Sequence, residues 1–280
     1  MPVVFGLLAA LLIGSSDFLG ARSAGRTTAL QTTTAAFLGG AVAVAVFSPV
    51  LGEPVARDLW LGAISGVAAA VALTTLWQGY ARSSIGVAAP VAAVFSTCLP
   101  VIYEAVRGDV PGRLGWAGLV VGVLALILTS WNPRHAGTGD SGDEVRTGVL
   151  LGALAGCAFA AMFVIAISTS EGSGTWPVVS QRLTAFVLAV GFGLATGRRP
   201  FADLGSVRWS VLAGVFGACG VASTVYGGQR GPVAPVIVAG SMYPAVAVGL
   251  AWLFMRQRLS RRQIAGLVAA LVGVVLISLD

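Results

Sequence analysis

Ala89-Pro-Val-Ala-Ala-Val-Phe-Ser-Thr-Cys-Leu-Pro-Val101 and Ala234-Pro-Val-Ile-Val-Ala-Gly-Ser-Met-Tyr-Pro-Ala-Val246 are two apolar stretches that begin 145 residues apart and carry two prolines each. Proline inside a helix removes a backbone donor and kinks or breaks the helix. Interrupted helices at matching positions in two halves of a membrane protein indicate a solute-binding site near the middle of the bilayer. The sequence therefore predicts helix kinks at four prolines: Pro90, Pro100, Pro235 and Pro244.

The composition indicates that lipid is the solvent for most of the chain. Hydrophobic residues make up 56% of the 280 residues, charged residues make up 10%, and the mean hydropathy is +0.89. A helix needs about 20 mostly apolar residues to cross a bilayer core of ~30 Å. The stretches that meet this requirement are long and continuous, unlike the short alternating strands of a barrel. They cover roughly residues 3–21, 29–51, 59–81, 85–106, 114–131, 147–169, 174–196, 207–227, 232–255 and 263–279.

We therefore expect an all-α polytopic protein of ten transmembrane helices in the cell membrane. The two proline-rich segments follow Tyr80 and Tyr226, and similar residues recur with offsets of 145 to 148, so each half contributes five helices. Because five is odd, the second half enters the membrane from the opposite face, which gives inverted repeats. The expected organisation is a first repeat at residues 1–131, a polar linker at 132–146 and a second repeat at 147–280.

Glycines at four-residue spacing indicate where the predicted helices pack closely. They form two pairs and one triplet: Gly62 with Gly66, Gly118 with Gly122, and Gly148 with Gly152 and Gly156. Small residues at this spacing allow helix backbones to approach each other where lipid offers no hydrophobic drive for association. We expect these glycines to serve packing rather than ligand binding.

Signals for catalysis, cofactors or nucleic acid are weak. Gly137-Thr-Gly-Asp-Ser-Gly142 matches a dinucleotide-binding pattern, but it lies in the predicted linker without a preceding strand. One histidine and three dispersed cysteines do not provide the spacing of a metal site. The 17 basic residues are all arginine and fall mostly in the loops. Arginines in the loops of a membrane protein set the orientation of its helices, so they do not indicate nucleic-acid binding. We expect no enzyme activity, no cofactor and no metal.

The chain resembles the EamA-like ten-helix branch of the drug/metabolite transporter superfamily. The resemblance covers nearly the whole chain and rests on Gly14-Ser-Ser-Asp-Phe-Leu-Gly20, on the two proline-rich helices, and on the segments that follow them. In that family the last pattern reads Gly-Glu-Arg-Leu-Ser, whereas here it reads Arg256-Gln-Arg-Leu-Ser260 and, in the first half, Gly108-Asp109. The glutamate is thus absent from both places. The resemblance implies a ten-helix membrane transporter.

Three ionisable residues fall inside predicted spans, where a charge is costly unless it faces a bundle interior or a water-filled cavity. They are Asp17, Glu104 and Arg182. One hypothesis pairs Glu104 with Arg182, since both lie on the same side of the midplane. The alternative is that Glu104 sits at the interface and pairs with Arg107, three residues further along.

Uncharged polar residues complete the set of candidate substrate-binding residues. Gln31 and Gln78 lie toward the same membrane face as Asp17, whereas Gln181 and Tyr226 lie toward the other face. Three hydroxyl residues lie between the prolines of the kinked helices and could bind a solute or their own backbone: Ser96, Thr97 and Ser241.

The sequence favours a secondary transporter that moves a small polar metabolite, with export favoured and amino acids or related compounds among the candidates. Proton coupling would require a titrating carboxylate near the cavity, for which Asp17 and Glu104 are the candidates, and uncoupled transport fits equally well. The alternatives are a lipid or lipid-linked metabolite translocase and a non-transporting membrane scaffold. The solute, the direction, the coupling ion, the orientation of the termini and the oligomeric state stay open.

Overall fold

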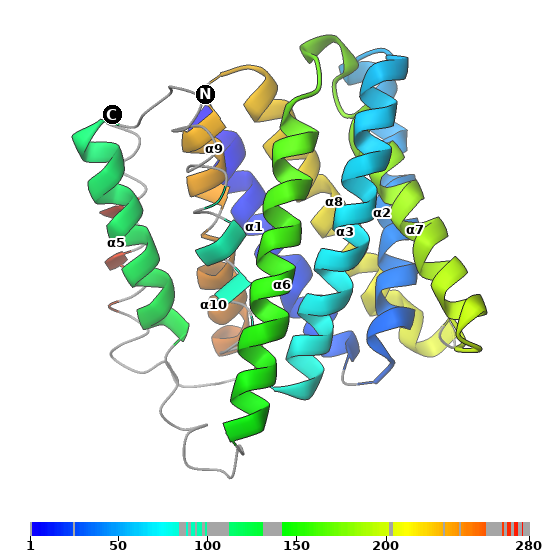
Figure 1. Ribbon diagram of the computed structural model, residues 1–280. Helices are drawn as coiled ribbons and strands as arrows, with labels where there is room; N and C mark the ends of the chain where they lie inside the picture. Colours follow the sequence, from blue (N-terminus) through cyan, green and yellow to red (C-terminus); the bar gives the residue numbers. More distant parts are fainter. Residues whose placement is uncertain are drawn as a thin grey trace.

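The computed structural model describes residues 2–24, 26–83, 112–130, 142–201, 204–231, 233–240 and 242–255. It also describes residues 88, 91–92, 94–96 and 99 and residues 265, 268–269, 272–273 and 276. Every regular element in these residues is helical (Figure 1). The elements are α1 (Pro2–Ala24), α2 (Ala29–Leu51), α3 (Ala56–Arg82), α5 (Arg113–Ser130), α6 (Gly142–Ile167), the short 3-10 helix η1 (Glu171–Ser173), α7 (Trp176–Ala195), α8 (Leu204–Gln229), α9 (Val233–Gly240) and α10 (Tyr243–Met255).

Six of these helices are long and apolar enough to cross a membrane. They are α1, α2, α3, α6, α7 and α8, and each lies within a few residues of a span predicted from the sequence. The prediction of an all-helical, multi-pass membrane protein is therefore confirmed for the described part of the chain. The predicted spans at 85–106 and 263–279 lie mostly outside the described residues.

The predicted span at 232–255 is divided into two shorter helices. Helix α9 ends at Gly240, and α10 begins at Tyr243, with Pro244 as its second residue. A proline is well tolerated in the first turn of a helix, where its missing N–H has no partner to lose. Pro235 likewise lies in the first turn of its helix, as the third residue of α9. Pro90 and Pro100 lie outside the described residues.

Local capping interactions fix where individual helices begin and end. At the start of α2, the Thr28 hydroxyl accepts from the Gln31 backbone N–H, and the Gln31 side chain accepts from the Thr28 N–H. At the end of α7, Gly197 adopts a positive φ of 65°, its N–H bonds Leu194 O, and the Arg198 N–H bonds Gly193 O. This is the arrangement of a Schellman motif, which needs a left-handed residue and therefore favours glycine.

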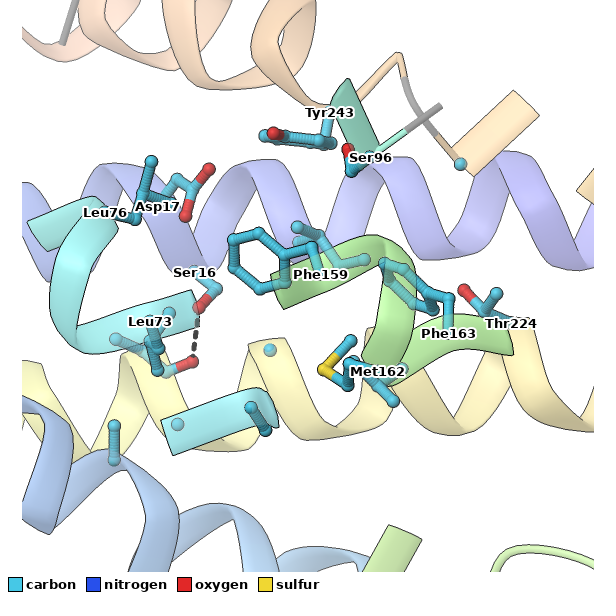
Figure 2. Close-up of a pocket in the computed structure, with 18 of the residues that line it drawn as sticks. Ser16, Asp17, Leu73, Leu76, Ser96, Phe159, Met162, Phe163, Thr224 and Tyr243 are labelled. Carbon is cyan, nitrogen blue, oxygen red and sulfur yellow. Dashed lines mark hydrogen bonds between the residues drawn. The ribbon is translucent and has the colours of Figure 1, made fainter. Parts of the chain in front are cut away.

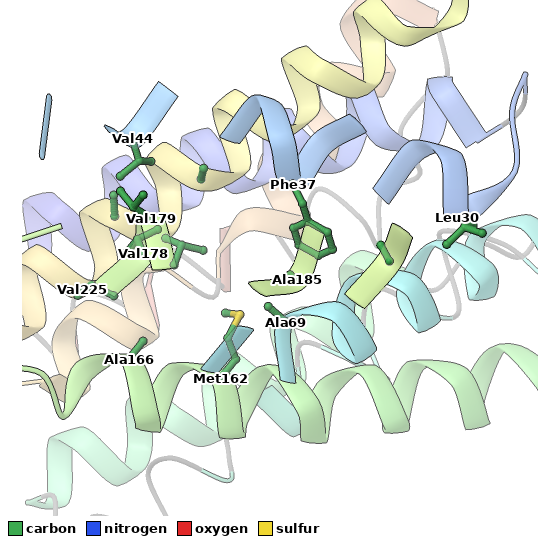
Figure 3. Packing of buried hydrophobic residues seen from close by; sticks show 14 residues of the cluster. Leu30, Phe37, Val44, Ala69, Met162, Ala166, Val178, Val179, Ala185 and Val225 are labelled. Atoms are coloured by element: carbon green, nitrogen blue, oxygen red, sulfur yellow. The ribbon is translucent and has the colours of Figure 1, made fainter. Parts of the chain in front are cut away.

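The helices pack as a bundle in which the two halves of the chain interleave. Helix α1 packs mainly on α8, α3 packs on α6 and α7, and α2 packs on α7 and α8, while α9 and α10 lie against α1. The main apolar cluster joins α2, α3, α6, α7 and α8 (Figure 3). Phe37, Met162 and Val178 are fully or almost fully buried within it, and alanines fill much of the remaining space. Large apolar side chains such as Val50 and Trp60 are exposed on the outside, as expected for a lipid-facing surface.

Glycines allow α3 to approach α7 at the distance of backbone contact. A Cβ atom on Gly66 would lie 2.5 Å from the Gln181 carbonyl oxygen, and one on Gly62 would clash with the Pro177 carbonyl. Because the obstructing atoms belong to the backbone, a side-chain rotation cannot relieve the overlap. By contrast, a Cβ atom on Gly191, on an exposed part of α7, would meet nothing within 4 Å.

We expect Gly66→Ala to lower the free energy of unfolding by about 1–3 kcal/mol, because the added methyl group must push α3 and α7 apart. The measurement is thermal unfolding of the purified protein in detergent. Gly191→Ala is the matched control and should leave the midpoint unchanged or raise it slightly, since alanine favours a helix. Equal midpoints for the two variants would contradict the close α3–α7 contact.

Candidate functional site: a central cavity between the halves

A cavity lies between the helices, and we call it the central cavity. Its volume is about 70 Å³, counted as space for the centre of a water-sized sphere. One water needs roughly 10–15 Å³ on this measure, so the cavity has room for several waters or a small solute. The lining residues are Ile13, Ser16, Asp17, Ala36, Ala69, Leu73, Leu76, Trp77, Ser96, Phe159, Met162, Phe163, Arg182, Ala213, Gly214, Gly217, Val221, Thr224, Gly240 and Tyr243.

Both halves of the chain build the central cavity. Helices α1, α2 and α3 contribute from the first half, and α6, α7, α8, α9 and α10 contribute from the second. The two proline-rich segments meet there as well, because Ser96 of the first and Gly240 and Tyr243 of the second line the same space. Figure 2 shows Asp17, Tyr243 and Phe159 around this space, each from a different helix.

Asp17 supplies a carboxylate to the cavity wall. Only 6% of the residue is exposed, and the Tyr80 hydroxyl of α3 donates toward Oδ2 at 3.4 Å, which is long for a hydrogen bond. The fully buried Trp77 lies one turn before Tyr80 and also lines the cavity. The carboxylate therefore lies among aromatic side chains rather than in lipid.

Arg182 supplies the positive charge of the cavity wall, and it also is only 6% exposed. One terminal nitrogen of its guanidinium donates to Gly217 O of α8 at 3.2 Å, and the guanidinium carbon lies 5.8 Å from the centre of the Phe37 ring. Its Nε atom is buried and has no hydrogen-bond partner. Among the described residues, no carboxylate forms an ion pair with Arg182. Glu104, the partner suggested by the sequence, lies outside them.

Two serine hydroxyls fasten the helices next to the cavity. Ser16 of α1 donates to Ala213 O of α8 at 2.7 Å, the bond drawn in Figure 2, and Ser65 of α3 donates to Met162 O of α6 at 2.9 Å. Gln181 of α7 is fully buried and donates to the Ser65 hydroxyl at 2.7 Å. Gln181 thus forms part of a structural link between α7, α3 and α6 and is not among the cavity-lining residues.

The other glutamines and Tyr226 lie away from the cavity lining. Gln31 caps α2 and donates to Phe201 O at 3.2 Å. Gln78 is half-buried on α3. Tyr226 meets the ring of Phe5 edge-on, with centroids 5.5 Å apart, and carries the Arg230 guanidinium 3.5 Å above its own ring.

Of the ten candidate residues from the sequence, the structure brings Asp17, Ser96 and Arg182 to the central cavity. Thr97, Glu104 and Ser241 lie outside the described residues. The aromatic wall of Tyr243, Phe159 and Phe163 was missed by the sequence analysis. Tyr243 could have been found, because it directly precedes Pro244 in the interrupted segment, whereas the two phenylalanines look like ordinary core residues of an apolar helix.

The hydrogen-bond chain through Ser65 gives a testable expectation. Ser65→Ala leaves the buried Gln181 side-chain N–H without its acceptor and removes one hydrogen bond to the Met162 carbonyl, and we expect a loss of about 1–3 kcal/mol in the free energy of unfolding. Ser168→Ala is the control, since the exposed Ser168 hydroxyl, just beyond the end of α6, bonds Val164 O in the last turn of that helix. Thermal unfolding in detergent checks both variants. A Ser65→Ala protein as stable as the control would show that this link contributes nothing.

Comparison with solved structures supports the fold. The crystal structure of another protein superposes with a TM-score of 0.75 at 19% sequence identity, and the match covers 99% of this chain and 96% of the other. At this identity the likeness concerns the fold alone. A search of curated proteins finds no match.

The second part of the chain also matches a family model. The match covers residues 146–279, from the start of α6 to the last residues of the chain, and the family is described as the EamA-like transporter family. This finding confirms the resemblance noted in the sequence over residues 146–279. Residues 146–279 therefore carry an EamA-like transporter family domain, within a multi-pass membrane protein.

Proposed function

We propose that the protein is a secondary transporter that moves a small polar metabolite across the cell membrane by alternating access. The observation that carries this proposal is the central cavity, which holds the buried side chains of Asp17 and Arg182 between helices from both halves. A charged group is placed inside a membrane at a considerable cost, and such groups usually mark a solute or ion pathway. Export is the favoured direction, and amino acids or related compounds are among the candidate solutes.

Many transporters achieve alternating access with two inverted repeats, and the packing supports two inverted five-helix repeats at residues 1–131 and 147–280, joined by a linker at 132–146. If α6, α7 and α8 are the counterparts of α1, α2 and α3, then the α1–α8 contact corresponds to the α6–α3 contact. The α2–α8 contact corresponds to α7–α3, and all four are extensive. The family match over residues 146–279 supports the boundary of the second repeat.

Hydrogen bonds near the cavity fit the same symmetry. Met162 follows Ser16 by 146 residues, and Ala213 follows Ser65 by 148, so the two pairs occupy corresponding positions. Ser16 bonds the Ala213 carbonyl, and Ser65 bonds the Met162 carbonyl. The α1–α8 contact and the α3–α6 contact thus carry equivalent serine–carbonyl bonds on either side of the cavity.

Polar contacts close the bundle at both ends, where a transporter needs gates. At one end, the Ser23 and Ser210 hydroxyls are 2.7 Å apart and join α1 to α8. At the other end, the Ser48 hydroxyl lies 2.8 Å from the Thr175 hydroxyl, and the buried Asp58 carboxylate accepts from the Ser170 N–H at 3.0 Å. Such bonds can be exchanged for bonds to water when one end opens.

Disulfides across the two ends test the proposal. In a background with Cys98, Cys157 and Cys219 replaced by alanine, we expect the pair Ser23→Cys and Ser210→Cys to stop transport when oxidised. The pair Ser48→Cys and Thr175→Cys should do the same, because alternating access requires each end to open in turn. A reducing agent should restore transport in both cases.

The solute for this measurement comes from an untargeted comparison of metabolites released by cells with and without the protein. Each single-cysteine variant is the control and should transport under oxidising conditions. Full transport with both ends locked would rule out alternating access between these gates. Release of lipids rather than soluble metabolites would instead favour a lipid translocase.

Of the two candidates for proton coupling, Asp17 lies in the described part of the chain, and this residue lines the cavity. If it exchanges a proton in each cycle, Asp17→Asn should abolish the dependence of flux on a pH gradient across proteoliposomes. Asp143→Asn, which changes an exposed carboxyl group at the start of α6, is the control. An unchanged pH dependence in Asp17→Asn would remove this residue as a coupling site.

A further inference from the structure

We propose that the solute carries a carboxylate group and that Arg182 is the residue of the central cavity that binds it. This inference rests on the proposed function and adds the chemical class of the solute. It is carried by one juxtaposition: a buried guanidinium with an unpartnered N–H group lies on the wall of a cavity that both halves of the protein build.

The first step concerns the charge of Arg182. A buried cation is strongly destabilising unless an anion or several hydrogen-bond acceptors compensate it. Among the described residues, Gly217 O is the hydrogen-bond acceptor that Arg182 contacts, and the Phe37 ring adds a weak attraction at 5.8 Å. Of the described acidic side chains, Asp17 bonds Tyr80, Asp58 bonds Ser170 and Glu171 pairs with Arg230, while Glu53 and Asp143 are exposed and are not among the cavity-lining residues.

The second step concerns geometry. A guanidinium presents its N–H groups as a planar fork that matches the two oxygens of a carboxylate. In Arg182 the bond to Gly217 O uses a terminal nitrogen, whereas Nε keeps a free donor. A carboxylate in the cavity can therefore bond the guanidinium N–H groups that Gly217 O leaves free, and bonding to the buried Nε needs a small shift of the side chain. The anion would supply the compensation that no described residue of the protein provides.

The third step concerns the rest of the solute. Beyond its charged groups, the cavity wall consists mainly of apolar side chains, including Leu73, Phe159, Phe163 and Val221. Such a surface favours a solute whose remaining atoms are apolar over a solute with many hydroxyl groups, because buried hydroxyl groups would lose their hydrogen bonds to water without replacement. The chemical class that fits is a small carboxylate with an apolar body.

Matched pairs of probes test this inference on the purified full-length protein. Leucine and leucinamide form one pair, and phenylpropionate and phenylpropionamide form the other, so that each pair differs by a carboxylate against an amide of nearly the same shape. Binding is read from the fluorescence of Trp77, which lines the cavity, and independently from the shift of the thermal unfolding midpoint. Trp77→Phe identifies the part of the fluorescence change that comes from the cavity.

We expect at least one carboxylate to bind the wild-type protein at least about tenfold more tightly than its amide, as befits a charge-assisted hydrogen bond. Arg182→Gln should remove this preference, and Arg182→Lys, which keeps the charge but loses the fork, should retain part of it. Arg199→Gln is the matched control: Arg199 is exposed and is not among the cavity-lining residues, so its loss should leave the preference unchanged.

Three results would overturn the inference: no binding of either carboxylate, equal binding of carboxylate and amide, or an unchanged preference in a folded Arg182→Gln protein. If Arg182→Gln does not fold, Arg182→Lys decides, because its preference must fall below that of the wild type. The disulfide experiment is independent of solute charge. A protein whose transport is blocked at both gates but which ignores the carboxylate probes would retain the proposed function and refute the role of Arg182.

Discussion

The close contact between helices of opposite halves is the interaction on which the structure depends. Lipid offers no hydrophobic drive to bring two apolar helices together, so shape and polar bonds must do so. Gly66 lets α3 reach the backbone of α7, and serine hydroxyls bond carbonyls across the α1–α8 and α3–α6 contacts. Because each strong contact joins one half to the other, the cavity lies between the halves rather than within either of them.

The same arrangement explains how two charged side chains are accommodated. Asp17 and Arg182 come from α1 and α7, and both face a space that can hold water or a solute. Asp17 has the Tyr80 hydroxyl nearby, while Arg182 has a carbonyl, an aromatic face and one unpartnered N–H group. The chain from Gln181 through Ser65 to the Met162 carbonyl instead links α7, α3 and α6. Position on the cavity wall is what separates a candidate binding group from a structural one, because buried polar atoms without a partner also occur away from the cavity, Gln181 Oε1 among them.

From the sequence alone, polar residues close to the ends of the spans could serve solute binding or structure, and the contacts in the structure distinguish these roles. Gln31 and Tyr226 each looked like a possible binding residue by position. Gln31 instead completes a helix cap, and Tyr226 packs between Phe5 and Arg230. Their roles depend on which neighbours the fold brings to them, and those neighbours are distant in sequence: Phe201 for Gln31 and Phe5 for Tyr226.

The sequence by itself determined the helical, multi-pass architecture, because crossing lipid requires long apolar runs, and such runs can be read without knowing their partners. It also singled out Asp17, Ser96 and Arg182, since a polar group is conspicuous in an apolar span. Only the tertiary structure decided which candidates share one cavity, which of them bond other helices, and that Phe159, Phe163 and Tyr243 form the aromatic wall. An apolar residue that faces lipid, a core or a cavity looks the same in sequence, and the difference arises solely from how the helices pack.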